Sequence, residues 1–173
     1  MPSSKYLRTT WYDPRAEIRP SFIQGNGMFA SQPIHEGEIV VIIGGTVMTE
    51  EEFRVYILTV SRFNAVQIGE DNHLVDTPTA SGGMNHSCDA NLWMRDEVIV
   101  IARREIAANE ELTQDYALYT TNPEWTLKPC YCRAPVCRKV VAGTDWQRTD
   151  VQEHYRDHFS PFINERIRRL SQH

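Results

Sequence analysis

Long apolar segments are absent from this sequence. The strongest hydrophobic runs, residues 39–43 and 98–102, are far shorter than the roughly 20 residues that a transmembrane helix requires. The first residues, Met-Pro-Ser-Ser-Lys-Tyr, contain no apolar stretch of the kind that forms a signal peptide. We therefore expect a cytoplasmic protein that has no membrane partner.

An excess of basic residues is also missing. The 18 Lys and Arg residues are outnumbered by 23 Asp and Glu residues, which gives a net charge of −5. Neutralisation of phosphates by basic side chains drives most nucleic-acid binding. We therefore expect no direct, sequence-specific contact with nucleic acid, whereas the acidic clusters could attract a basic peptide.

Cysteine is scarce, and its spacing is informative. The chain has 4 cysteines, of which three form a C-x-C-x4-C motif and one lies about forty residues upstream; they are Cys88, Cys130, Cys132 and Cys137. Two disulfides are one interpretation. A reducing cytoplasm keeps thiols free and favours a tetrahedral thiolate zinc site. Four thiolates leave zinc no open position, so we predict one structural zinc ion.

The middle of the chain alternates short strands with turns. At 173 residues, one domain with a real core is expected. Strands are predicted at residues 38–43 and 98–102, and a hairpin is predicted from residues 64–68 and 73–76. Residues 24–27 read as a tight turn. Thr49 and Glu52 form a capping box, which predicts a helix that ends near Arg62.

The end of the chain has helical periodicity. Thr149 and Gln152 suggest a second capping box, and Ser160-Pro161 suggests the start of another helix. Apolar residues recur on one face at Val151, Tyr155 and Phe159. We expect two short amphipathic helices that pack on the strands; a homodimer through these helices is the alternative. His154 and His158 are predicted to be exposed helix histidines rather than metal ligands.

Five motifs occur in the order found in one enzyme family. They are Gly-Asn-Gly-Met-Phe-Ala at 25–30, Glu-Gly-Glu-Ile-Val at 36–40, N-H-S-C-x-x-N at 85–91, the segment 106–116 that ends Glu-Glu-Leu-Thr-Gln-Asp-Tyr, and the cysteine trio. Together they resemble the SET-domain protein-lysine methyltransferases with a zinc-binding post-SET segment, and the tail is similar to that of short bacterial members.

The resemblance implies a β-rich α+β fold. In that fold several small β-sheets surround a pseudoknot, formed here by the N-H-S-C and E-L-T-x-D-Y segments. We expect a SET domain at residues 18–118, a post-SET zinc segment at 124–143 and a helical tail at 145–171. The bacterial cytoplasm or nucleoid is the expected location.

The resemblance also implies S-adenosylmethionine as methyl donor. Carried over by motif, the expected cofactor-binding residues are Gly25, Asn26, Gly27, Met28, Asn85, His86, Tyr116, Trp125 and Leu127. Tyr116 is expected at the methyl-transfer centre as the catalytic residue, and Asp115 is expected to anchor local backbone.

The substrate channel departs from the family pattern. Gln114 stands where many members carry Phe or Tyr, Ile43 stands where many have a channel tyrosine, and Met94 could replace another. The expected substrate is a protein with an accessible lysine in a basic or histone-like peptide. One alternative is a catalytically silent SET-fold module that binds a basic peptide. A second is a zinc-stabilised nucleic-acid module, motivated by Arg133, Arg138 and Lys139.

Overall fold

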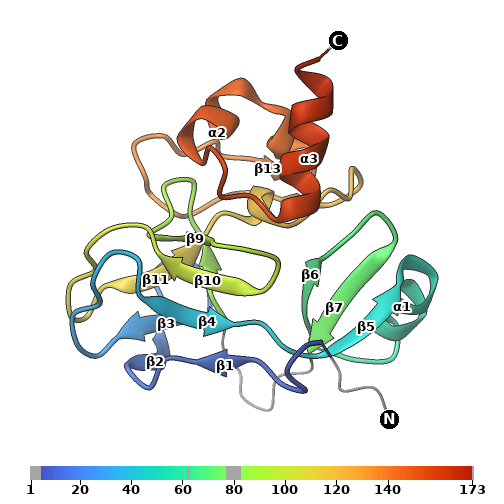
Figure 1. The fold of residues 1–173 in the computed structure, drawn as a ribbon. Helices are drawn as coiled ribbons and strands as arrows, with labels where there is room; N and C mark the ends of the chain where they lie inside the picture. Colours follow the sequence, from blue (N-terminus) through green and yellow to red (C-terminus); the bar gives the residue numbers. More distant parts are fainter. Residues whose placement is uncertain (1–4, 62, 77–82, 173) are drawn as a thin grey trace.

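A β-sheet that curves around the core is the centre of the molecule. The computed structural model describes residues 5–61, 63–76 and 83–172 (Figure 1). Within these residues, the largest sheet has the order β1-β4-β10-β9-β11-β3-β2, and β8 pairs with β11 beside this path. Its strands are β1 (Trp11–Tyr12), β2 (Ala16–Pro20), β3 (Asn26–Ala30), β4 (Ile39–Ile42), β8 (Asn85–His86), β9 (Leu92–Met94), β10 (Ile99–Ala102) and β11 (Glu111–Gln114).

The topology of β11 brings distant motifs together. β11 runs antiparallel to β3 and parallel to β8 and β9. In this register Thr113 lies opposite Asn85, and Gln114 lies opposite His86. The 3₁₀ helix η1 (Tyr116–Leu118) follows β11 directly. The N-H-S-C and E-L-T-x-D-Y motifs are therefore neighbours in space, as predicted.

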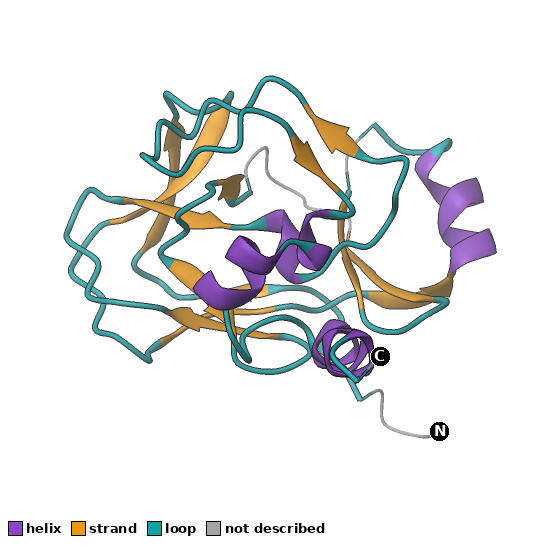
Figure 2. Ribbon diagram, turned by 90° about the horizontal axis from the view of Figure 1, so that it is seen from above, coloured by secondary structure: helices purple, strands orange, loops and turns teal. Residues whose placement is uncertain are grey.

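A smaller sheet with one helix lies at the side of the main sheet. It has the order β5-β7-β6 and consists of β5 (Thr46–Thr49), β6 (Asn64–Gln67) and β7 (Asn72–Asp76), with α1 (Glu50–Ile57) after β5. Figure 2 shows α1 at the edge of the molecule, away from the other helices. The predicted hairpin and the predicted turn between β2 and β3 are both confirmed.

The first capping box forms, but α1 is shorter than predicted. The Thr49 side chain accepts from the Glu52 amide, and the Glu52 carboxylate accepts from the Thr49 amide. The helix ends at Ile57, because the following amides bond to carbonyls only three residues back and the Thr59 hydroxyl donates to the Tyr56 carbonyl. The predicted end, Arg62, lies outside the described residues.

The C-terminal segments cover the main sheet. They are β12 (Thr126–Leu127), β13 (Val141–Ala142), the 3₁₀ helix η2 (Asp145–Gln147), α2 (Thr149–His154) and α3 (Pro161–Leu170). Val151, Tyr155, Phe159 and Ile163 are buried in the same apolar cluster as the strands. These tail residues therefore pack against the strands, and a homodimer stays a prediction. None of the described helices has the length and hydrophobicity that a bilayer span demands.

The second capping box was predicted wrongly. Thr149 is already the first residue of α2, and the N-cap position belongs to Arg148, which makes no side-chain cap. The side-chain Nε2 of Gln152 instead donates to the Trp146 carbonyl at 2.9 Å. Ser160 does precede α3 as predicted, although its carbonyl and not its hydroxyl makes the helical hydrogen bonds.

Candidate active site and cysteine cluster

The side chains of the four cysteines lie close to one another. Their Sγ atoms all lie within 4.8 Å of one another, and the four thiols are free. Four sulfurs around zinc at about 2.3 Å stand about 3.8 Å apart, so this donor set fits a tetrahedral zinc ion. Cys88 and Cys130 are buried, whereas Cys132 and Cys137 are half-buried.

The thiols of the cluster have divergent pKa values. Burial raises the pKa of Cys88 far above its usual range and that of Cys130 to about 11. Burial acts in the same direction on Cys132, but backbone amides and neighbouring thiols that donate to its sulfur lower its pKa to about 7. Packing thiolates this closely needs a cation, and zinc supplies one.

Tyr116 is linked to this cluster through His86, whose Nε2 lies 3.2 Å from Cys88 Sγ. Its hydroxyl donates to the Met84 carbonyl at 3.0 Å, and its backbone amide donates to His86 Nδ1 at 3.3 Å. The Tyr116 ring lies 5.2 Å from the His86 ring and 5.7 Å from the Trp125 ring, measured between centroids. Burial raises the pKa of Tyr116 to about 12, so the phenol is neutral at physiological pH.

Asn85 joins β8 to the turn between β2 and β3. Its side-chain amide donates to Glu111 Oε1 at 2.8 Å and to the Gln24 carbonyl at 3.1 Å. Gly25 has a positive φ of 50°, which this turn requires. The side-chain nitrogen of Asn85 is thus fixed, while no donor to its oxygen occurs among the described residues.

A cavity of about 1110 Å³ opens beside these groups. Of the predicted site residues, it is lined by Asn26, Ile43, Asn85, Gln114, Tyr116 and Trp125. The other predicted site residues do not line it: Gly25, Gly27, Met28, His86, Met94 and Leu127. Of these, Met28, His86 and Met94 are buried, and Leu127 packs against the cysteine cluster.

Two of the three predicted channel residues, Gln114 and Met94, form a hydrogen-bonded pair. Gln114 is 1% exposed, and its amide Nε2 donates to the Met94 sulfur at 3.1 Å. Met94 therefore supports Gln114 from behind instead of facing the cavity. Two tyrosines that sequence reasoning missed, Tyr12 and Tyr119, also line the cavity. They come from β1 and from the residue after η1, outside the five motifs.

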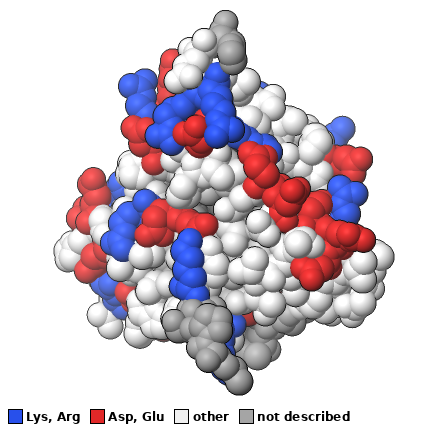
Figure 3. Space-filling model, turned by 45° about the vertical axis from the view of Figure 1, so that its right-hand side comes forward, with Lys and Arg blue, Asp and Glu red and all other residues white. Residues whose placement is uncertain are grey.

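Three glutamates line the cavity, Glu50, Glu70 and Glu124. Arg54 and Arg166 also line it, and they form ion pairs with Glu50 and Glu70. Glu51 and Glu52 extend the acidic first turn of α1. Figure 3 shows a band of Asp and Glu side chains across the face formed by the smaller sheet and α1. Glu51 and Glu124, which make no ion pair among the described residues, would attract a cationic ligand.

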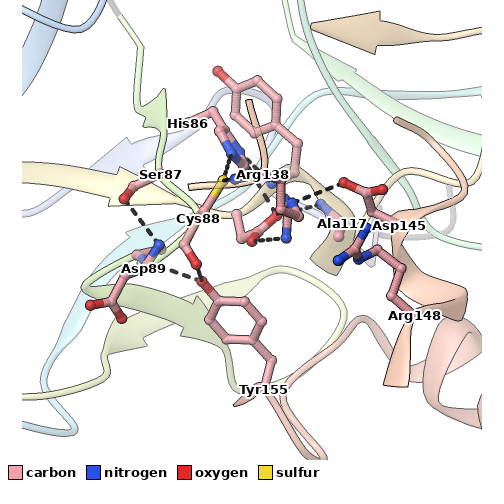
Figure 4. Close-up of polar contacts among 12 residues, drawn as sticks. His86, Ser87, Cys88, Asp89, Ala117, Arg138, Asp145, Arg148 and Tyr155 are labelled. Carbon is pink, nitrogen blue, oxygen red and sulfur yellow. Dashed lines mark hydrogen bonds and ion pairs between the residues drawn. The ribbon is translucent and has the colours of Figure 1, made fainter. Parts of the chain in front are cut away.

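Several side chains have roles that the sequence did not indicate. Arg138, placed by the nucleic-acid hypothesis on a basic surface, has a side chain only 5% exposed and forms ion pairs with Asp115 and Asp145 (Figure 4). Asp115 does anchor backbone as predicted, since it accepts from the Ala117 amide. Ion pairs between distant segments leave no local sequence signal.

The two histidines of the tail were also misjudged. His154 is half-buried and bonds Asp89 at 3.1 Å. His158 lies beyond α2 and stacks on Trp93, with ring centroids 3.4 Å apart. His154 fixes the tail to the loop before β9, and His158 fixes it to β9 itself, so both are structural contacts.

Comparison with known proteins supplies relatives. A SET-domain family model matches residues 25–117. Histone-lysine N-methyltransferase ATX2 of Arabidopsis thaliana is 28% identical over 159 residues, which cover 83% of this chain and 14% of ATX2. Histone-lysine N-methyltransferase trr of Drosophila melanogaster is 33% identical over 152 residues, which cover 79% of this chain and 6% of trr. This chain thus spans a small part of these curated relatives.

A solved structure shares the fold. The methyltransferase domain of human histone-lysine N-methyltransferase SETMAR superposes with a TM-score of 0.55 at 22% identity, over 75% of this chain and 57% of that one. The β-rich fold with few helices is that of a SET fold, and so is the pairing of the N-H-S-C segment with the E-L-T-x-D-Y segment.

Proposed function

This chain belongs to the SET-domain family, and we propose that it is a protein-lysine N-methyltransferase that uses S-adenosylmethionine. The observation that carries the proposal is the position of Tyr116. Its phenol is fixed by Met84 and borders a large cavity between the Asn85 motif and Trp125. A neutral, oriented phenol at the wall of a cavity suits a reaction that needs a positioned amine.

The β2–β3 turn and β8 are the proposed cofactor seat. Asn26 and Asn85 line the cavity at this end, and Gly25, Gly27, Met28 and His86 are their neighbours in the turn, in β3 and in β8. The side-chain oxygen of Asn85 is available as an acceptor, and Trp125 and Leu127 would cover the adenine. When bound, S-adenosylmethionine supplies an electrophilic methyl group.

The chain's own residues prepare the lysine. A lysine amine has a reference pKa of about 10.4, so its deprotonation at neutral pH costs on the order of 4 kcal/mol. Apolar cavity residues such as Val41, Ile43 and Ile57 would desolvate the ammonium and lower its pKa. The Tyr116 oxygen can hydrogen-bond the amine and orient it. Because the Tyr116 pKa is about 12, this phenol is no base and only positions.

The cysteine cluster is proposed to hold one structural zinc. Cys88, Cys130, Cys132 and Cys137 would bind it, and zinc would fasten the post-SET segment, residues 124–143, to the SET domain, residues 18–118. The acidic groups without an ion pair beside the cavity, Glu51 and Glu124, favour a basic protein segment as substrate.

Methyl transfer to protein tests the proposal. Purified protein is incubated with methyl-labelled S-adenosylmethionine and either histones or lysate proteins. Labelled lysine is expected, and Tyr116→Phe should lower kcat about a hundredfold while cofactor affinity barely changes, since the contact matters in the transition state. Tyr131→Phe is the matched control, because this tyrosine is 59% exposed. Full activity in Tyr116→Phe would contradict the assigned role.

A silent module that binds a basic peptide is the second candidate. The pairing of Gln114 with Met94 and the apolar Ile43 favour it, since both reduce the polar groups available to an amine. Calorimetry separates the two candidates. Cofactor binding without transfer to any protein would support the silent module.

A further inference from the structure

Arg138 connects three segments that are distant in sequence. Its guanidinium donates from Nη1 to Asp115 Oδ2 and from Nη2 to Asp115 Oδ1, both at 2.8 Å. Its Nε lies 2.9 Å from Asp145 Oδ2, as an ion pair without hydrogen-bond alignment. Its backbone amide donates to Cys88 Sγ at 3.4 Å. Figure 4 shows Arg138 between Asp145 and the His86–Cys88 segment.

The contact with Asp115 reaches the Tyr116 turn. The side chains of Arg138 and Asp115 are 5% and 0% exposed, so little water competes for this pair. Asp115 caps η1 by accepting from the Ala117 amide at 3.0 Å, and its carbonyl accepts from Leu118. The orientation of the Asp115 carboxylate therefore fixes the first turn after β11, which carries Tyr116.

The contact with Asp145 also links Arg138 to the C-terminal tail. Asp145 begins η2, and the following Trp146 is buried in the main apolar cluster. Two buried carboxylates thus share one guanidinium. A single cation that satisfies two carboxylates holds both of their segments in one geometry, because displacing it leaves buried charge unpaired.

We propose that Arg138 is a positioning residue that holds the Tyr116 turn in register with the cysteine cluster and the tail. Its planar fork is required, because a lysine ammonium cannot make two parallel bonds to Asp115. The consequence for catalysis rests on the proposed function, whereas the consequence for the turn does not.

Hydrogen exchange tests the positioning role without any assay of activity. The substitution is Arg138→Lys, and the matched control is Arg148→Lys, which breaks a two-point pair with Asp150 on the surface. Exchange of the amides at 117–120 should accelerate about tenfold or more in Arg138→Lys, while amides of the β4–β10 ladder keep their wild-type rates. Arg148→Lys should match wild type throughout. Unchanged exchange at 117–120 in Arg138→Lys would overturn the proposal.

A second variant covers the case in which Arg138→Lys does not fold. Asp115→Asn and Asp145→Asn combined with Arg138→Met remove all three charges and keep an acceptor for the Ala117 amide. Acceleration at 117–120 is again expected, and wild-type exchange in this folded variant overturns the proposal.

Kinetics then separate the positioning role from the proposed function. In Arg138→Lys, kcat should fall about tenfold or more, while the KM for peptide and the Kd for S-adenosylhomocysteine change less than about threefold. Equal losses in kcat and in cofactor affinity would contradict a positioning role. If the wild-type protein transfers no methyl group, the proposed function fails and the exchange rates alone decide the role of Arg138.

Discussion

Gly27 has no space for a side chain. A Cβ atom there would overlap the Glu111 carboxylate, with Glu111 Cδ at 2.8 Å and Asn85 Nδ2 at 3.0 Å. Since Glu111 also accepts from Ser21, it cannot move away without breaking other bonds. Gly27→Ala should therefore displace Asn85 and weaken S-adenosylhomocysteine binding about tenfold, as measured by calorimetry. Gly69→Ala, where a Cβ meets only ordinary contacts, should bind like wild type.

Gln114 is the residue from which the product can be predicted. It borders the cavity beside Tyr116, and its amide is anchored on Met94. A polar side chain here can hold a water that occupies the space a second or third methyl group needs. We expect mono- or dimethyl-lysine, and Gln114→Phe should raise the degree of methylation. Mass spectrometry of a methylated peptide measures this, and mainly trimethyl-lysine from the unmodified protein would refute the argument.

At the scale of elements, α1 depends on its cap. The helix has no fully buried residue, and its packing rests mainly on Phe53, which stacks on His73, so the Thr49 cap is an important part of its stability. Thr49→Ala should destabilise α1 by about 1 kcal/mol, seen as faster amide exchange in residues 50–57. Thr149→Ala is the control, because Thr149 caps nothing. Equal effects in the two helices would contradict this reading.

The turn between β1 and β2 should be sensitive to acid. Three donors of Arg15, its backbone amide, Nε and Nη2, bond the buried Asp13 carboxylate. These bonds lower the pKa of Asp13 below its usual value. The stabilisation is therefore complete above the unfolded pKa, about 3.9, and is lost as the pH falls through the lower folded pKa.

Asp13→Asn is the variant that checks this. It should reduce the free energy of unfolding by about 1–2 kcal/mol at pH 7, and the difference from wild type should shrink below about pH 4 as wild-type Asp13 takes up a proton. Urea denaturation at both pH values measures it. Asp71→Asn is the control, since Asp71 makes no side-chain hydrogen bond among the described residues. A difference that is the same at pH 7 and pH 3 would rule out the Asp13 carboxylate as its source.

At the scale of the whole molecule, the cysteine cluster fastens the late segments to the sheet. We expect one zinc per chain by elemental analysis, and Cys88→Ser should lower both the zinc content and the Tm. Val136→Ser, at a position 57% exposed in the same loop, should keep the metal. Chelation should also weaken cofactor binding, because the post-SET segment carries Trp125. Unchanged zinc in Cys88→Ser would remove Cys88 from the ligand set.

Local signals predicted the elements well. Alternating β-branched runs, the Asn-Gly turn and the Thr49 box each depend on residues within about ten positions, and each formed. The capping box predicted at Thr149 did not form, because the same Thr-x-x-Gln spacing also fits a threonine that is the first residue of the helix and not its N-cap. The motifs also predicted the neighbourhood of Asn85, Tyr116 and the cysteines, although their roles as site residues stay predictions.

Contacts between distant segments could not be predicted. Arg138 and Asp115 are 23 residues apart, and Trp93 and His158 come from β9 and the tail. Nothing in the composition around Arg138 distinguishes a buried ion pair from a basic surface. The pairing of Gln114 with Met94 likewise depends on the parallel register of β11 and β9.

The burial of Tyr155 and Ile163 among the strands has a consequence for how the chain is made. Both residues are fully buried, and the Tyr155 hydroxyl bonds the backbone on either side of Asp89. A ribosome adding about 5–20 residues per second needs on the order of ten seconds to proceed from β2 to Ile163. Until then the sheet lacks its apolar cover. The apolar face of the strands therefore stays uncovered during this time, and the core is completed only after the tail has emerged.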